Sequence, residues 1–176
     1  SMRINLKNVP QKCRCDIAKK AMTEEIITDI SHALQGLSGE ENAECYCEIA
    51  LDAINDDEEI WFWSSGGDGQ IPENCKEQIT DAILQNDEKL GKYKDYLIRQ
   101  TNNTEEVIVE KILASLESGK ISKDLDWDFY THFAMKSSPY KRMGTINRIE
   151  KIMADNQEFL QHFRTHGRRV LGVDDD

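Results

Sequence analysis

The sequence predicts an α+β protein, with a small antiparallel sheet and flanking helices followed by a C-terminal helical bundle. Polar and apolar residues alternate in 3–7 and 44–51, and residues 58–64 are rich in aromatic side chains, as strands are. Apolar residues recur at helical spacing through most of residues 89–166. The chain of 176 residues is long enough to bury a core without staples.

The first module is expected to cover residues 1–87 in the order strand, helix, hairpin, helix. A short strand spans residues 3–7, and a helix over 16–34 is followed by Gly36, a residue favoured at helix ends. The hairpin joins 44–51 to 58–64 through turn-forming residues. Its first strand places four apolar residues on one face: Cys45, Cys47, Ile49 and Leu51.

The second module is expected to be helical over residues 88–170 and to pack into the same compact unit, with a frayed acidic tail over 171–176. The β-branched run Val107-Ile108-Val109 is assigned to a helix because acidic residues precede it. Gly119 and Gly167 are expected to end helices. The expected helices span 89–100, 105–118, 123–136 and 142–166.

Charge is distributed very unevenly along the chain, whose net charge is −11. Residues 21–75 contain fourteen acidic residues and no Lys or Arg, whereas residues 136–169 contain eight basic residues and three acidic ones. A folded acidic segment must spread its carboxylates over outward faces. One interpretation is a solvated face that maintains solubility. Another is a surface that copies the charge of duplex DNA and occupies a basic channel of a partner protein.

The second interpretation predicts a non-enzymatic inhibitor that docks on a basic protein, a nucleic-acid-binding effector or toxin. Small acidic proteins of this kind include anti-restriction and anti-CRISPR inhibitors and toxin-immunity proteins, an analogy of composition. The strand-and-turn region supplies the docking residues, with two tryptophans as apolar anchors. The predicted docking residues are Asp52, Asp56, Asp57, Glu58, Glu59, Trp61 and Trp63.

Two other classes of function stay open. The helices from 105 to 166 could form a helix-turn-helix-like unit that binds nucleic acid directly, or their cations could neutralise the acidic half of the chain. The candidate nucleic-acid-binding residues are Lys141, Arg142, Arg148, Lys151, Arg168 and Arg169. The third class is a small metal-dependent hydrolase or nuclease with dispersed carboxylates.

No cofactor, metal or catalytic residue is predicted. The pairs Cys13-x-Cys15 and Cys45-x-Cys47 are spaced more closely than zinc ligands usually are. His162 and His166 lack the neighbouring glutamate of a zinc-protease helix. Five cysteines are an odd number, so reduced thiols and a cytoplasmic location are expected. The longest apolar runs are far shorter than a membrane span, so no membrane contact is expected.

Overall fold

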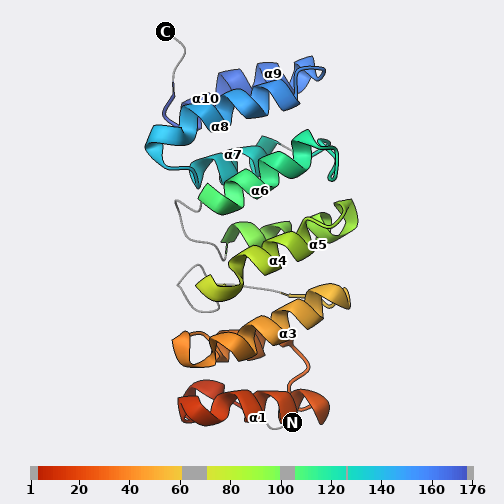
Figure 1. The fold of residues 1–176 in the computed structure, drawn as a ribbon, viewed down its shortest axis with the longest axis vertical. Helices are drawn as coiled ribbons and strands as arrows, with labels where there is room; N and C mark the ends of the chain where they lie inside the picture. The colour runs from red at the N-terminus through yellow and green to blue at the C-terminus, as the bar shows by residue number, and fades with distance from the viewer. Residues whose placement is uncertain (1–3, 61–70, 100–105, 126, 174–176) are drawn as a thin grey trace. The chain divides into compact units, whose positions relative to one another are not determined.

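The computed structural model describes residues 4–60, 71–99, 106–125 and 127–173. Within these ranges the chain is helical and contains no strand (Figure 1). It divides into two compact units. The first comprises Ser1–Ile83 with Gly91–Thr101, and the second comprises Leu84–Leu90 with Asn102–Asp176.

The first unit contains α-helices and three short 3-10 turns among its described residues. The 3-10 turns are η1 (Leu6–Asn8), η2 (Glu40–Asn42) and η3 (Glu73–Cys75). The α-helices are α1 (Gln11–Thr23), α2 (Ile30–Gly36), α3 (Ala43–Asn55), α4 (Lys76–Ile83) and α5 (Asp87–Arg99), of which α5 begins in the second unit.

Helices of the second unit run from residue 106 to residue 170. They are α6 (Glu106–Glu117), α7 (Trp127–Met135), α8 (Pro139–Ile152), α9 (Gln157–His162), the π-helical segment η4 (Phe163–Gly167) and α10 (Arg168–Val170). The helix expected at 105–118 is therefore present, with Ile108 and Val109 buried on its inner face. Gly119 follows it with a φ of 76°, the left-handed conformation that favours glycine after a helix.

The predicted α+β fold is wrong, because the expected hairpin does not form. Residues 44–51 lie in α3, whose buried positions Tyr46, Ile49, Ala50, Ala53 and Ile54 repeat every three to four residues. That helical period competes with the alternation and prevails because it buries more apolar side chains. Residues 58–60 are not in a strand, and 61–64 lie outside the described residues.

The expected N-terminal strand and two long helices also need correction. Leu6 lies in η1 and packs against Gly36, where a Cβ on the glycine would lie 2.5 Å from the Cβ of Leu6. The predicted helix over 16–34 is two helices, separated by Glu25 in the left-handed region and restarted by Asp29, whose side chain accepts from the Ser31 amide. The sequence pattern missed this break because apolar residues continue through it.

The expected helix over 142–166 is broken as well. It ends at Ile152 and restarts after Asn156, whose side chain accepts from the Phe159 amide. Gly167 does not end a helix, since it lies where η4 meets α10. The Phe163 ring lies so close to the backbone of Gly167 that a Cβ there would be 2.6 Å from the ring. Glycine is therefore required at this position.

Four of the five cysteines form disulfides, contrary to the reduced thiols expected. Cys45 of α3 is bonded to Cys15 of α1, and Cys47 of α3 is bonded to Cys75 of η3, while Cys13 is free. Two residues turn a helix by about 200°, so Cys45 and Cys47 leave α3 on opposite flanks. The disulfides therefore attach α3 to a different element on each side.

Candidate functional site: the acidic ridge of helix α3

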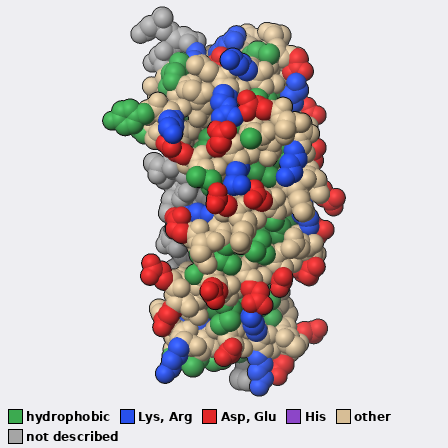
Figure 2. Space-filling view, in the orientation of Figure 1, with side chains coloured by type: hydrophobic (Ala, Val, Ile, Leu, Met, Phe, Trp, Pro, Cys, Tyr) green, Lys and Arg blue, Asp and Glu red, His purple; other side chains and the backbone are tan. Residues whose placement is uncertain are grey.

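Helix α3 separates its apolar residues from its carboxylates. Its inner face is buried, and four exposed acidic residues follow one another at intervals of four along its outer face. We call Glu44, Glu48, Asp52 and Asp56 the acidic ridge. Four residues advance an α-helix by about 6 Å, so the ridge is a regular row of negative charges. Figure 2 shows acidic side chains exposed over the α3 part of the first unit.

The ridge continues into a short turn, Asp57–Glu59, which we call the acidic turn and whose three side chains are exposed. Five predicted docking carboxylates are thereby brought together at the C-terminal end of one helix. The expected anchors Trp61 and Trp63 lie outside the described residues. Glu44 and Glu48 were missed by the sequence reasoning, although the spacing of 44, 48, 52 and 56 is a helical signal.

The backbone of the acidic turn is fixed by hydrogen bonds at the end of α3. Asp57 has a φ of 58°, and the amide of Glu58 donates to the carbonyl of Ala53 at 2.9 Å. The hydroxyl of Tyr93 on α5 donates to the carbonyls of Glu58 (2.5 Å) and Ala53 (3.3 Å). Lys92 donates to the carbonyl of Asp57. Helix α5 therefore positions the acidic turn through its backbone.

Tyr93 keeps its proton across the physiological range. Burial of the ring, followed by the neighbouring charges of Asp57 and Glu58, raises the pKa of Tyr93 to about 12. The neutral hydroxyl keeps the one proton that it shares between the carbonyls of Glu58 and Ala53.

Few cations within the described residues neutralise the acidic ridge. Lys19 of α1 pairs with Glu48 at 2.8 Å, and this hydrogen bond raises the pKa of the exposed Lys19 ammonium. Glu44, Asp52 and Asp56 make no ion pair with any described residue, although Lys19 also feels the charge of Asp52. The outer face of α3 therefore carries a mostly uncompensated negative charge.

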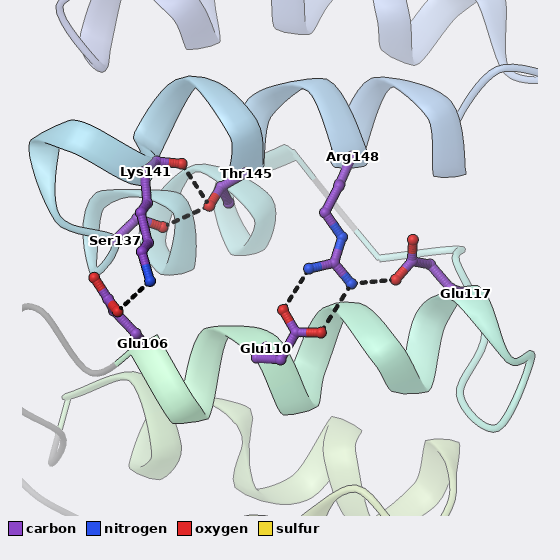
Figure 3. Close-up of polar contacts among 7 residues, drawn as sticks. All are labelled: Glu106, Glu110, Glu117, Ser137, Lys141, Thr145 and Arg148. Atoms are coloured by element: carbon purple, nitrogen blue, oxygen red, sulfur yellow. Dashed lines mark hydrogen bonds and ion pairs between the residues drawn. The ribbon is translucent and has the colours of Figure 1, made fainter.

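The cations proposed to bind nucleic acid lie in the second unit, and several are already occupied by carboxylates. Lys141 of α8 pairs with Glu106 of α6 at 2.7 Å. Arg148 donates to both Glu110 and Glu117 of α6, one of its bonds to Glu110 measuring 3.2 Å (Figure 3). These cations neutralise α6 and not the acidic segment 21–75.

The other predicted cations divide between structural and exposed positions. Arg142 donates to the carbonyls of Leu171 (3.3 Å) and Met135 (3.4 Å), which joins α8 to the end of α10. Arg168 is buried and pairs with Glu150 at 3.4 Å. Lys151 and Arg169 are exposed and make no ion pair with a described residue.

A groove of about 670 Å³ lies between α6 and α8. Val109 and Leu113 contribute apolar surface, while Tyr140 at its rim is 98% exposed. The hydroxyls of Ser137 and Thr145 bond to each other at 2.9 Å, and the ion pairs of Figure 3 line the remaining wall. The polar side chains of Ser137, Thr145, Lys141 and Glu106 in this wall are thus paired with one another.

The ion pairs between α6 and α8 make the second unit sensitive to acid. Hydrogen bonds from Arg148 lower the pKa of Glu110 below its ordinary value of 4.5. A carboxylate with a lowered pKa contributes stability above pH 4.5 and loses it as the pH falls through the lowered value.

We therefore expect Arg148→Met to lower the free energy of unfolding at pH 7 by about 1 kcal/mol, a small figure because the pair is partly solvated. At a pH well below 4.5 the difference from the parent protein should be smaller, because Glu110 becomes protonated as the pH falls through its lowered pKa. Urea unfolding at the two pH values measures this. An equal difference at both would contradict the role assigned to the pair.

The described residues contain neither a metal-binding cluster nor a membrane-spanning helix. No three His, Cys, Asp or Glu side chains there are grouped so that they could hold a metal ion. The rings of His162 and His166 lie 4.8 Å apart, as a pair. None of the described helices combines the length and apolar composition needed to cross a bilayer.

Comparison with known proteins does not extend this description to a family. Neither a protein family, nor a characterised protein, nor a solved structure matches the chain at a significant level.

Proposed function

We propose that the protein is a non-enzymatic binding protein whose acidic ridge and acidic turn dock on a basic surface of a partner. The observation that carries this proposal is the row of carboxylates on α3, of which Glu48 alone makes an ion pair with a described residue, within a 55-residue segment that contains no Lys or Arg. A row of this kind attracts a cationic surface over a Debye length of about 8 Å at physiological salt. It accelerates association and selects partners by charge.

The arrangement favours a partner whose own function is to bind nucleic acid. Such proteins present rows of Lys and Arg to a regularly charged backbone, and the ridge repeats its charge about every 6 Å along a rigid helix. Inhibition of a nucleic-acid-directed effector or a toxin is the role we assign to this contact. The tryptophans expected to anchor it stay a prediction.

Rigidity of the ridge supports binding. The inner face of α3 is buried, disulfides attach it on two flanks, and Tyr93 fixes its C-terminal turn. A surface that is ordered before association loses less conformational entropy on binding.

Direct binding of nucleic acid is the weaker alternative. Lys141 and Arg148 are engaged by glutamates of α6, so this function would have to rely on Lys151 and Arg169 among the predicted cations. No specific observation supports the metal-dependent hydrolase.

The disulfides also bear on the compartment. Disulfide bonds persist chiefly in oxidising compartments. The cytoplasmic location expected from the sequence therefore stays a prediction, and the paired cysteines favour an oxidising environment instead.

A matched pair of variants tests the proposal. The ridge variant Glu44→Lys, Asp52→Lys, Asp56→Lys replaces the three ridge carboxylates that make no ion pair with a described residue. The control variant Glu77→Lys, Asp95→Lys, Glu158→Lys makes the same change in net charge at exposed positions elsewhere. Both are first compared with the parent protein by circular dichroism and thermal melting.

Each immobilised protein is then exposed to nuclease-treated lysate, and bound proteins are eluted with salt and identified. At about 1 kcal/mol for each lost charge pair, the ridge variant should bind the captured partner roughly 100-fold more weakly. The control variant should retain binding within a few-fold. Equal losses of binding in the two variants would show that binding depends on net charge alone. That result would contradict a docking role for the ridge.

A further inference from the structure

Both disulfides of the protein end on the helix that carries the acidic ridge. Cys45 lies next to Glu44 and Cys47 next to Glu48 in sequence, so both attachment points lie between the first two carboxylates of the ridge. Their partners, Cys15 and Cys75, lie in different elements. The placement of the ridge is thus tied to the oxidation state of four sulfur atoms.

We propose that the acidic ridge is under redox control: the oxidised protein holds α3 in its docking position, and reduction of the two disulfides by a dithiol loosens it. This inference rests on the proposed function, because it assigns a regulation to the same docking surface.

The chemistry requires one dithiol reductant for each disulfide. A thiolate of the reductant attacks one cysteine sulfur, which breaks the S–S bond and releases the other cysteine as a thiolate. The second thiol of the reductant then displaces the protein from the mixed disulfide. Two electrons and two protons pass to the protein, which gains two thiols, and the reductant leaves as its own disulfide.

The two bonds differ in accessibility. Cys15 is half-buried, whereas Cys45 and Cys47 are each 7% exposed and Cys75 is 1% exposed. Attack by a thiolate needs access to a sulfur atom, so a reductant should reach Cys15 first. The bond between α1 and α3 is therefore expected to open before the bond between α3 and η3.

What remains after reduction holds α3 only in part. Its thirteen residues would be marginal as an isolated helix, so it depends on tertiary contacts. The hydroxyls of Tyr46 and Tyr96 bond at 2.8 Å, and Tyr93 still holds the acidic turn. With these contacts kept, we expect local opening of α3 and not unfolding of the whole chain.

The test measures helix protection and charge binding in the same protein. The Cys13→Ser variant serves as the background, since it removes the free thiol and prevents reshuffling. Amide hydrogen exchange is followed with and without dithiothreitol, and binding of a labelled nona-arginine peptide is measured at low salt. The variant Cys15→Ser, Cys45→Ser opens one bond without a reductant, and the ridge variant reports on charge.

Reduction should raise exchange in residues 43–55 by about tenfold or more while leaving α8 of the second unit unchanged. Nona-arginine should bind the oxidised protein more tightly than the reduced one. The serine pair should show an intermediate exchange rate in α3. Mass spectrometry of alkylated cysteines should find Cys15 and Cys45 modified first.

Unchanged exchange in α3 on complete reduction would overturn the redox control, whatever the peptide result. Faster exchange throughout both units would also overturn it, since the disulfides would then support the whole fold. Equal binding of nona-arginine by the parent and ridge variants would instead overturn the docking role, and with it the control of docking, even if α3 is loosened. The two failures are therefore distinguishable.

Discussion

Replacing Cys47 and Cys75 with alanine is expected to lower the free energy of unfolding of the first unit by about 3 to 4 kcal/mol. The bond closes a loop with a sequence separation of 28 residues, and its loss releases conformational entropy to the unfolded chain. The change corresponds to a melting temperature lower by roughly 15 to 20 °C. The pair Cys15→Ala, Cys45→Ala, with a separation of 30 residues, should have a similar effect.

Differential scanning calorimetry without reductant measures both variants. Cys13→Ala is the matched control, since its thiol is free and half-buried, and it should change the free energy by no more than about 0.5 kcal/mol. Counting thiols in the denatured parent protein gives a second check, with one free thiol expected. A melting temperature unchanged by loss of either disulfide would contradict their role in holding α3.

Replacing Phe163 with alanine is expected to destabilise the second unit by about 3 to 5 kcal/mol. The ring is completely buried, stacks on Phe159 with centroids 5.5 Å apart, and closes on the backbone at Gly167. Phe159 in turn meets Tyr130 edge to face at 5.1 Å. Removing Phe163 therefore leaves a cavity between the π-helical segment and the aromatic side chains that it packs against.

Urea unfolding measures this effect against an aromatic control. Tyr140 is 98% exposed, so Tyr140→Ala should change the free energy of unfolding by less than about 0.5 kcal/mol. Phe163→Leu keeps most of the volume and should fall between the two. Similar losses for Phe163→Ala and Tyr140→Ala would contradict the placement of the aromatic core.

Helices α5, α6 and α7 were predictable from the sequence because their apolar period is unambiguous, whereas the prediction of one helix over 142–166 missed the break after Ile152. Ile108, Val109 and Ile112 bury one face of α6 despite their β-branched side chains, since packing outweighs intrinsic propensity. The N-terminal half failed at α3. There Cys45, Cys47 and Ile49 alternate, whereas Tyr46 and Ala50 complete a helical period, and a short apolar segment satisfies both patterns.

The acidic composition of the candidate site was predictable from the sequence, but the arrangement of its carboxylates along one helix was not. The absence of Lys and Arg from residues 21–75 is visible in the sequence, and the described carboxylates of this segment are exposed, as expected. Their arrangement as a ridge depends on α3 being a helix. Because residues 44–51 were predicted to be a strand, the predicted site did not include Glu44 and Glu48. The disulfides could not be inferred, because the spacing of five cysteines does not determine which pairs meet in space.

The neutralisation of Lys141 and Arg148 by α6 was equally invisible in the sequence. A cation on one helix and a glutamate more than thirty residues away share no sequence pattern, and they meet only because α6 packs on α8. The basic composition of residues 136–169 therefore overstated the charge available to a nucleic acid.

The docking role of the acidic ridge is tested most directly by a competition between the protein and duplex DNA for the captured partner. With the partner held at a fixed concentration together with labelled DNA, the parent protein should displace the DNA completely, and displacement should weaken as salt increases. The ridge variant should need roughly 100-fold more protein for the same displacement, and the control variant should match the parent. Simultaneous binding of protein and DNA to the partner would contradict the claim that the acidic ridge occupies a nucleic-acid-binding surface.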